Sequence, residues 1–282
     1  MPNSKSSTTR TAGMSASHTS LIAIICYLCA FATQARLSLY PNKTGSLTGK
    51  HITLAFSCLA LITHMITSWQ QIFTESGADF GVLPLSVAIF LIINFITVGA
   101  SLRQPLHSLF LLLFPLTIIA LTLSQLPLWQ NPSRYNFPLG LSLHILLSVI
   151  AYSLLSIAAL EALFLAYQNR QLHHHHTNPL MRALPPLQTM ERLLFRLVGI
   201  GFTLLTLALI SGLLFVDDFL SQHLAHKTVF SLIAWLTYAT FLWGRFRLGW
   251  RGKTAIHWTL GGFLFLMLAF WGSKFVLEVI LI

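Results

Sequence analysis

Two histidines, His64 and His144, lie inside long apolar stretches of the chain, where an ionisable side chain is costly and is therefore a candidate for function. Neutral imidazole is the commonest side-chain ligand of transition metals, and two imidazoles can hold a haem iron from opposite faces. The same pair could also bind another transition metal. The alternative that the sequence leaves open is that each ring only hydrogen-bonds a neighbouring carbonyl or hydroxyl group.

A polar stripe accompanies one of these histidines. Side chains able to form hydrogen bonds recur at every fourth position, at His144, Ser148, Tyr152 and Ser156. On a helix this spacing places them along one side, and within a bilayer such a side must face protein or a cavity. The stripe could contact the polar edge of a ligand, or it could hold helices together. Glu161, further along the same stretch, is expected to reach the membrane interface.

Two residues of a later apolar stretch are candidates for contacts to the same ligand. Lys227 begins this stretch and could pair with a ligand carboxylate such as a haem propionate, or with the nearby Asp217 or Asp218. A lysine that only extends its ammonium to the interface is the alternative. Trp235 is deeper in the stretch and could pack on a flat ligand, although core packing is the commoner role for an indole.

Other reactive residue types form weaker patterns. Cys26 and Cys29 have the C-x-x-C spacing, but Ala30 follows, so this is not a covalent haem-attachment motif. The four histidines from His173 to His176 could catch a metal loosely, without fixing a geometry. The sequence has no Gly-rich phosphate loop, no H-E-x-x-H and no G-x-S-x-G, and its seven acidic residues form no paired acid–base site. We therefore expect no enzyme.

The composition identifies the elements that must position these residues. Of the 282 residues, 55% are hydrophobic and 9% are charged, against about 25% charged in a soluble domain. That excludes a soluble enzyme, a disordered chain and a disulfide-stapled secreted module. A bilayer needs about 20 apolar residues per helix, and such runs occur at 17–38, 50–70, 82–102, 105–124, 138–168, 190–216, 226–244 and 255–279.

The predicted fold is therefore all-α, a polytopic membrane helix bundle of about eight transmembrane helices. Residues 1–16 form a polar N-terminal tail, and residues 17–282 form a single membrane domain. The helical rise of about 1.5 Å per residue places His64 and His144 at a similar depth, in the outer half of the membrane. Whether their two helices touch is left open by the sequence.

The distribution of basic residues predicts the orientation. The loops after the first, third, fifth and seventh segments hold all of the 17 Lys and Arg residues except Lys5, Arg10, Arg134, Lys227 and Lys274. By the positive-inside rule these loops are cytoplasmic, so both termini lie on the outer side. The net charge of +10 then reflects loops beside anionic lipid and not nucleic-acid binding. A cleaved signal peptide ending near Ala32 is the rival interpretation, but it would place three basic residues outside.

The second half of the chain carries a series of motifs: Leu184-Pro185-Pro186-Leu187, Met190-Glu191-Arg192-Leu193-Leu194-Phe195, Ser211-Gly212-Leu213, His226-Lys227-Thr228, Ala234-Trp235, Leu242-Trp243-Gly244-Arg245, Gly249-Trp250-Arg251-Gly252 and Phe270-Trp271-Gly272-Ser273. With Leu61-Ile62-Thr63-His64 and Leu143-His144, this pattern resembles the cytochrome c assembly protein family, which includes CcsA, CcmC and HemX-like branches. The resemblance is closest to the YpjD-type inner-membrane proteins.

The resemblance implies a multi-pass protein of the bacterial inner membrane that handles haem in cytochrome c maturation. His64 and His144 match the intramembrane histidines of the family, and Lys227 matches the lysine that opens its penultimate conserved helix. We therefore expect a non-covalent, b-type haem with these histidines as axial ligands and with Tyr152, Lys227 and Trp235 beside it. Expected partners are the lipid bilayer, haem, and cytochrome c maturation proteins or another membrane protein.

The chain departs from the family pattern in two places. The Trp-rich segment of the haem-presenting branches is absent before Lys227, where the sequence reads Asp217-Asp218-Phe219-Leu220-Ser221-Gln222-His223. Trp243 occupies a position that is a histidine in the synthase branch. These departures leave an alternative open, a non-catalytic regulatory or structural membrane partner that modulates haem synthesis or assists an ion-transport complex.

Overall fold

The computed structural model describes residues 5–40, 46–74, 77–79, 81–104, 106–126, 139–173, 184–215 and 222–272. The chain divides into two compact units, Met1–Asn136 (unit 1) and Phe137–Ile282 (unit 2), and each is considered by itself. Several residues named above lie outside the described part, namely His174 to His176, Asp217, Asp218 and Lys274.

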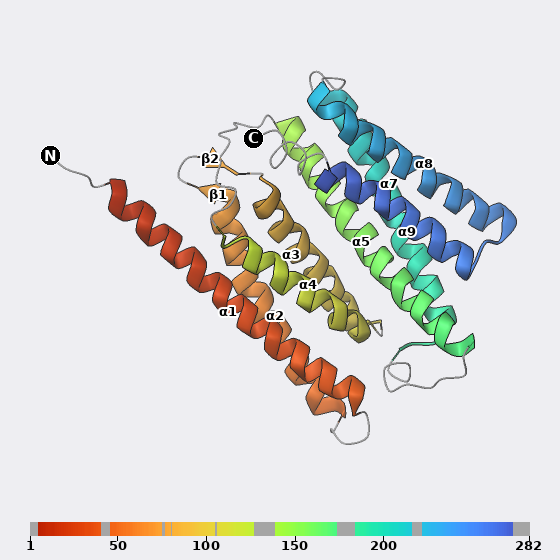
Figure 1. Cartoon of the computed structure of the whole chain (residues 1–282), viewed down its shortest axis with the longest axis horizontal. Coiled ribbons are helices and arrows are strands. Elements are labelled where there is room, and N and C mark those ends of the chain that lie inside the picture. The colour runs from red at the N-terminus through yellow and green to blue at the C-terminus, as the bar shows by residue number, and fades with distance from the viewer. Residues whose placement is uncertain are drawn as a thin grey trace. The chain divides into compact units, whose positions relative to one another are not determined.

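Unit 1 is built from four helices and a short hairpin (Figure 1). Its elements are α1 (Lys5–Leu39), α2 (Ser46–Ile72), β1 (Phe73–Thr74), β2 (Gly77–Ala78), α3 (Val82–Ser101), the 3-10 turn η1 (His107–Leu109) and α4 (Phe110–Leu123). The two strands pair antiparallel, with Phe73 opposite Ala78. Helix α1 packs along α2 and α4, and α3 packs against α2 and α4.

The core of unit 1 is apolar and aromatic. Tyr27 and Phe114 pack with their ring centroids 5.3 Å apart, and Phe114 stacks on Phe110 at 4.8 Å. Ala30 on α1 and Ala60 on α2 are fully buried, and such small side chains allow helix backbones to approach closely. This packing holds α1, α2 and α4 together around the Tyr27 ring.

In the described residues of unit 2, four helices run side by side (Figure 1). They are α5 (Leu139–His173), α7 (Leu187–Phe215), α8 (Gln222–Leu248) and α9 (Lys253–Met267), and α9 continues into the π-helical turn Leu268–Gly272. Helix α5 packs mainly against α7 and also against α9, while α8 packs against α9 and α7. At the centre of the α5–α7 contact, a side chain at Gly201 would collide with Leu155.

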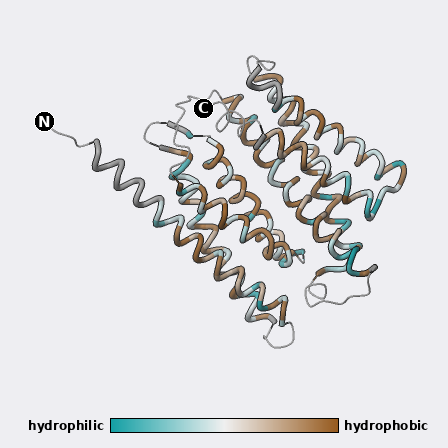
Figure 2. The backbone as a smooth tube through the Cα atoms, in the orientation of Figure 1, coloured by the Kyte–Doolittle hydropathy of each residue, from teal (hydrophilic) through white to brown (hydrophobic). Residues whose placement is uncertain are grey.

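Among the residues that the structure describes, seven helices are long and apolar enough to cross a membrane: Ser17–Leu39, Leu47–Ile72, Val82–Ser101, Leu139–Leu172, Leu187–Phe215, Lys227–Leu248 and Lys253–Phe270. Figure 2 shows hydrophobic residues along most of these helices and hydrophilic residues mainly near their ends. The prediction of an all-α, polytopic membrane bundle is confirmed. The orientation of the termini and the single domain over 17–282 stay predictions.

The fourth predicted segment differs from the others. Residues 105–124 were expected to form a full span, but the apolar helix here is the shorter stretch His107–Leu123. It begins as a 3-10 turn, and α4 itself has 14 residues, which corresponds to about 21 Å at 1.5 Å per residue. That is less than the roughly 30 Å of a bilayer core. Pro115 stands inside this helix, where it removes one backbone hydrogen bond.

Candidate functional site

His64 is a fully buried residue of α2 with both ring nitrogens engaged. Its Nε2 lies 3.1 Å from the carbonyl oxygen of Val87 on α3. Its Nδ1 lies 3.1 Å from the hydroxyl of Tyr27 on α1. A carbonyl oxygen only accepts hydrogen bonds, so Nε2 carries the proton and Nδ1 accepts from the Tyr27 hydroxyl. The imidazole therefore ties three helices of unit 1 together.

The surroundings of His64 leave no room around the ring. The Tyr27 ring meets the imidazole edge-on, with centroids 5.7 Å apart and planes at 87°. Tyr27 is itself fully buried and belongs to the aromatic core of unit 1. A metal could reach either nitrogen of His64 only after one of the two hydrogen bonds had broken.

His144 has a different environment on α5 in unit 2. Its ring is partly exposed, and its Nδ1 lies 2.8 Å from the carbonyl oxygen of Ala208 on α7. The Ser211 hydroxyl is 3.3 Å from the same nitrogen, and it also donates to the Ala208 carbonyl at 2.9 Å. Nδ1 must therefore be the protonated nitrogen. Its partner Nε2 is left as an unprotonated nitrogen with no hydrogen bond within the described part of the chain.

The geometry of His144 is the one that metal-binding histidines commonly adopt. Such residues usually donate one ring N–H to a backbone carbonyl, which fixes the tautomer and the ring orientation. The other nitrogen then presents its lone pair to the metal. His144 satisfies the first condition through Ala208 and offers Nε2 for the second.

The side chains of the polar stripe on α5 contact two neighbouring helices. His144 directs its Nδ1 toward α7, whereas the partly exposed ring of Tyr152 packs near Phe263 and Phe270 of the α9 segment, at 5.8 and 5.3 Å. Ser156 is buried and donates to the carbonyl oxygen of Tyr152 at 2.7 Å. The stripe therefore presents two side chains, an imidazole and a phenol, to the interior of unit 2.

The two candidates on α8 also belong to unit 2. Lys227 is exposed and begins the candidate span Lys227–Leu248. The Trp235 indole N–H donates to the Thr206 hydroxyl at 2.9 Å, and its ring stacks on Phe202 with centroids 5.6 Å apart. Trp235 thus has a polar and an apolar partner on α7. The Trp235 ring, which was predicted to pack against a flat ligand, already packs against Phe202.

Of the five predicted site residues, unit 2 contains His144, Tyr152, Lys227 and Trp235, while unit 1 contains His64. The described residues include no group of three or more His, Cys, Asp or Glu side chains that could hold a metal ion. Cys26 and Cys29 are free thiols, the first buried and the second partly exposed.

Sequence reasoning missed two features and misjudged a third. Tyr27 is the partner of His64, but the two residues are 37 positions apart and share no motif. Glu191 was noted only as part of a motif, yet it bonds both the Arg251 side chain and the Gly252 backbone N–H. Glu161 is 2% exposed, so the expectation that it reaches the interface is wrong.

The fold and the histidine pattern define a multi-pass helical membrane protein with intramembrane imidazoles. The profile described as "Cytochrome C assembly protein" matches residues 52–281, and the chain belongs to this family. It is a multi-pass protein of the bacterial inner membrane. The predicted family assignment is confirmed.

Three relatives show how far the similarity extends. The inner membrane protein YpjD of Escherichia coli K12 is 30% identical over 233 residues, which cover 82% of this chain and 88% of the relative. Protein HemX of Brevibacillus brevis is 23% identical over 254 residues, covering 86% and 92%. The cytochrome c biogenesis protein CcsA of Gloeobacter violaceus is 28% identical over 93 residues, covering 32% and 28%. No solved structure matches the chain.

Proposed function

We propose that this protein handles haem in the inner membrane as a non-catalytic accessory of cytochrome c maturation, binding a b-type haem non-covalently. Membership of the cytochrome c assembly family supports the maturation role. The observation that carries the haem assignment is the orientation of His144, whose Nδ1 is fixed by the Ala208 carbonyl while Nε2 remains available.

Unit 2 supplies further groups suited to the same ligand. Haem offers an iron that binds imidazole nitrogen, a flat apolar ring and two carboxylates. Lys227, exposed at the start of a span in the same unit as His144, has the charge to pair with a carboxylate. Tyr152 contributes an aromatic face on the same helix as His144. Trp235 is the least available of the group because its N–H and its ring are already engaged with α7.

His64 fits the role of axial ligand only after a rearrangement. Both of its nitrogens are bonded and none of its surface is accessible. Ligation by His64 would require loss of the bond to Tyr27 or to Val87. We therefore propose His144 as the ligand available in the arrangement described here, and His64 as a second ligand only if α1, α2 and α3 separate.

The test is the absorption spectrum of the protein purified from haem-replete cells. We expect a Soret band in the wild type, a pyridine haemochrome of the b type, and loss of most of the Soret absorbance in His144→Ala. His257→Ala is the matched control, because His257 is an exposed histidine near the start of α9. No Soret band in the wild type, or an unchanged band in a His64→Ala/His144→Ala double variant, would refute the haem assignment.

A regulatory or structural role is the competing assignment, and the fully bonded His64 favours it, because this imidazole acts as a tie between helices. Haem staining of c-type cytochromes in a deletion strain separates the two roles. Loss of the stained cytochromes supports the maturation role. Retention of all of them, with a change in haem synthesis or ion transport, supports the regulatory one.

A further inference from the structure

One end of unit 2 concentrates positive charge. The beginning of α7, the end of α8, the following turn and the beginning of α9 contribute six cationic side chains, at Arg192, Arg196, Arg245, Arg247, Arg251 and Lys253. The one carboxylate among the described residues of this end is Glu191. These helices are candidate membrane spans, so this end lies at a membrane surface. The distribution of basic residues predicts that the surface is the cytoplasmic one.

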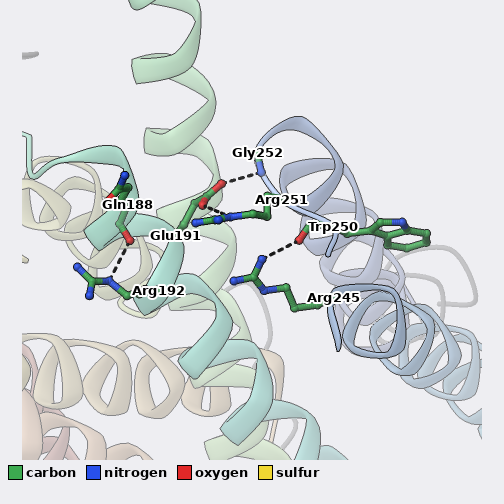
Figure 3. Close-up of polar contacts among 7 residues, drawn as sticks. All are labelled: Gln188, Glu191, Arg192, Arg245, Trp250, Arg251 and Gly252. Carbon is green, nitrogen blue, oxygen red and sulfur yellow. Dashed lines mark hydrogen bonds and ion pairs between the residues drawn. The ribbon is translucent and has the colours of Figure 1, made fainter. Parts of the chain in front are cut away.

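Glu191 is already neutralised by the turn between α8 and α9. Its Oε2 is 3.2 Å from Nε of Arg251, and its Oε1 accepts the Gly252 N–H at 2.7 Å (Figure 3). The turn can follow this path because Gly249 and Gly252 adopt φ angles of 68° and 55°, which other residues rarely adopt. Glu191 therefore fastens the turn to α7, and each of its oxygens already accepts a hydrogen bond from that turn.

Arg245 also makes its contacts within this end of the unit. Its Nη1 donates to the carbonyl oxygen of Trp250 at 3.3 Å (Figure 3). Its guanidinium lies 4.1 Å above the centre of the Phe195 ring. The Trp250 ring in turn stacks on Trp258, with centroids 5.2 Å apart. These contacts hold the turn between α8 and α9 against α7 and place the Arg245 charge inside this end of the unit.

No carboxylate partner occurs among the described residues for Arg192, Arg196, Arg247 or Lys253. Arg192 uses its Nε to donate to the Gln188 carbonyl at 3.3 Å, which leaves its terminal nitrogens unused. Arg251 is 57% exposed despite its contact with Glu191. Figure 3 shows these two arginines on either side of Glu191. Arg196, Arg247 and Lys253 are exposed as well.

Exposed apolar side chains accompany these cations on the last turns of α8. Trp243 is 58% exposed, Phe246 is 83% exposed and Leu248 is 59% exposed. Exposure of these apolar side chains to water would be unfavourable, whereas contact with lipid acyl chains removes them from water. Free guanidinium groups match the geometry of phosphate oxygens. Guanidinium groups and exposed aromatic rings on the same turns suit a molecule with a phosphate head and an apolar tail.

We propose that this end of unit 2 binds the phosphate of an anionic phospholipid. Arg192, Arg247 and the outer nitrogens of Arg251 contact the headgroup, and Trp243 and Phe246 contact the acyl chains. Glu191 and Arg245 hold the turn in place and do not touch the lipid. The site is independent of the haem assignment, because it uses no residue of that assignment.

The test is competition for a fluorescent phosphatidylglycerol bound to the full chain in mild detergent. Unlabelled phosphatidylglycerol is expected to displace the probe, whereas phosphatidylcholine and inorganic phosphate at equal concentration are not. Arg192→Gln/Arg247→Gln leaves the Glu191 contacts intact. At about 1 kcal/mol per cation near an anionic surface, this variant should bind phosphatidylglycerol roughly 30-fold more weakly.

Two variants control this experiment. Arg36→Gln/Arg103→Gln removes the same charge from exposed positions of unit 1 and should bind like the wild type. Glu191→Gln keeps every cation, and its amide oxygen still accepts the Gly252 N–H, so its affinity should be at least that of the wild type. The proposal is overturned if phosphatidylcholine competes equally or if Arg192→Gln/Arg247→Gln binds normally. It is also overturned if the unit 1 control loses as much affinity, or if inorganic phosphate displaces the probe as well as lipid does.

Discussion

The hydrogen bond between Tyr27 and His64 gives the sharpest test of how unit 1 is held together. Tyr27→Phe removes the hydroxyl that donates to His64 Nδ1 at 3.1 Å and leaves the aromatic ring in place. Both side chains are fully buried, so no water can take the place of the lost hydroxyl. The variant therefore leaves a buried acceptor without a donor.

The size of the effect follows from this burial. An unsatisfied buried acceptor costs about 1–3 kcal/mol in soluble proteins. Hydrogen bonds between membrane helices average about 0.6 kcal/mol and reach about 1.7 kcal/mol. We therefore expect Tyr27→Phe to lower the free energy of unfolding by about 1–2 kcal/mol. In a chain of this size that corresponds to a fall in Tm of roughly 2–6 °C.

The assay is thermal unfolding of the purified protein in detergent, arranged as a double-mutant cycle with His64→Phe. Tyr167→Phe is the control, because no hydrogen bond of the Tyr167 hydroxyl occurs within the described part of the chain. The cycle should give a coupling of about 0.6–1.7 kcal/mol between Tyr27 and His64. Zero coupling, with Tyr27→Phe as stable as wild type, would refute the bond. It would also favour a His64 whose nitrogens are engaged elsewhere, as in haem ligation.

Four further substitutions test three separate places in the fold by the same unfolding measurement. Glu161→Leu should raise the Tm, because it replaces a carboxyl that is 2% exposed and has no hydrogen bond within the described residues; a large loss of stability would contradict this. Gly244→Ala should cost about 1–3 kcal/mol, since a Cβ there would overlap the Trp250 ring. An unchanged Tm would show that the turn carrying Trp250 shifts to make room. Trp235→Phe and Thr206→Val should each cost about 1 kcal/mol and should not add in combination, because they remove the same hydrogen bond; full additivity would show that this bond is absent.

The helices could be predicted from the sequence because hydropathy is a local property. The expected segment 82–102 is the helix Val82–Ser101, and the expected 17–38 is the span Ser17–Leu39. The hairpin between α2 and α3 has two residues in each strand, too few for any alternation to be visible. The shortness of α4 depends on where the chain turns before η1, which mean hydropathy does not record.

The site could be predicted only as a set of candidate residues. Position along a helix follows from the number of residues, so the depth of an imidazole can be estimated. The hydrogen-bond partners of an imidazole cannot be predicted in this way, because they lie on other helices. Val87 is 23 positions from His64, and Ala208 is 64 positions from His144. Helical periodicity identifies the side of a helix that is polar, but not the helix that this side contacts.

These partners make two residues of one type chemically different. In each histidine one ring nitrogen donates to a backbone carbonyl, which fixes the ring orientation and identifies that nitrogen as a proton carrier. The second nitrogen decides the role, because at His64 it accepts the Tyr27 hydroxyl and at His144 it has no partner among the described residues. Ligation of iron by His144 alone therefore leaves the described contacts intact. Ligation by both would also have to supply the free energy of breaking one of the two His64 hydrogen bonds. If ligation breaks the Tyr27 bond, Tyr27→Phe removes this cost and changes the haem content, whereas ligation by His144 alone leaves the haem content unchanged.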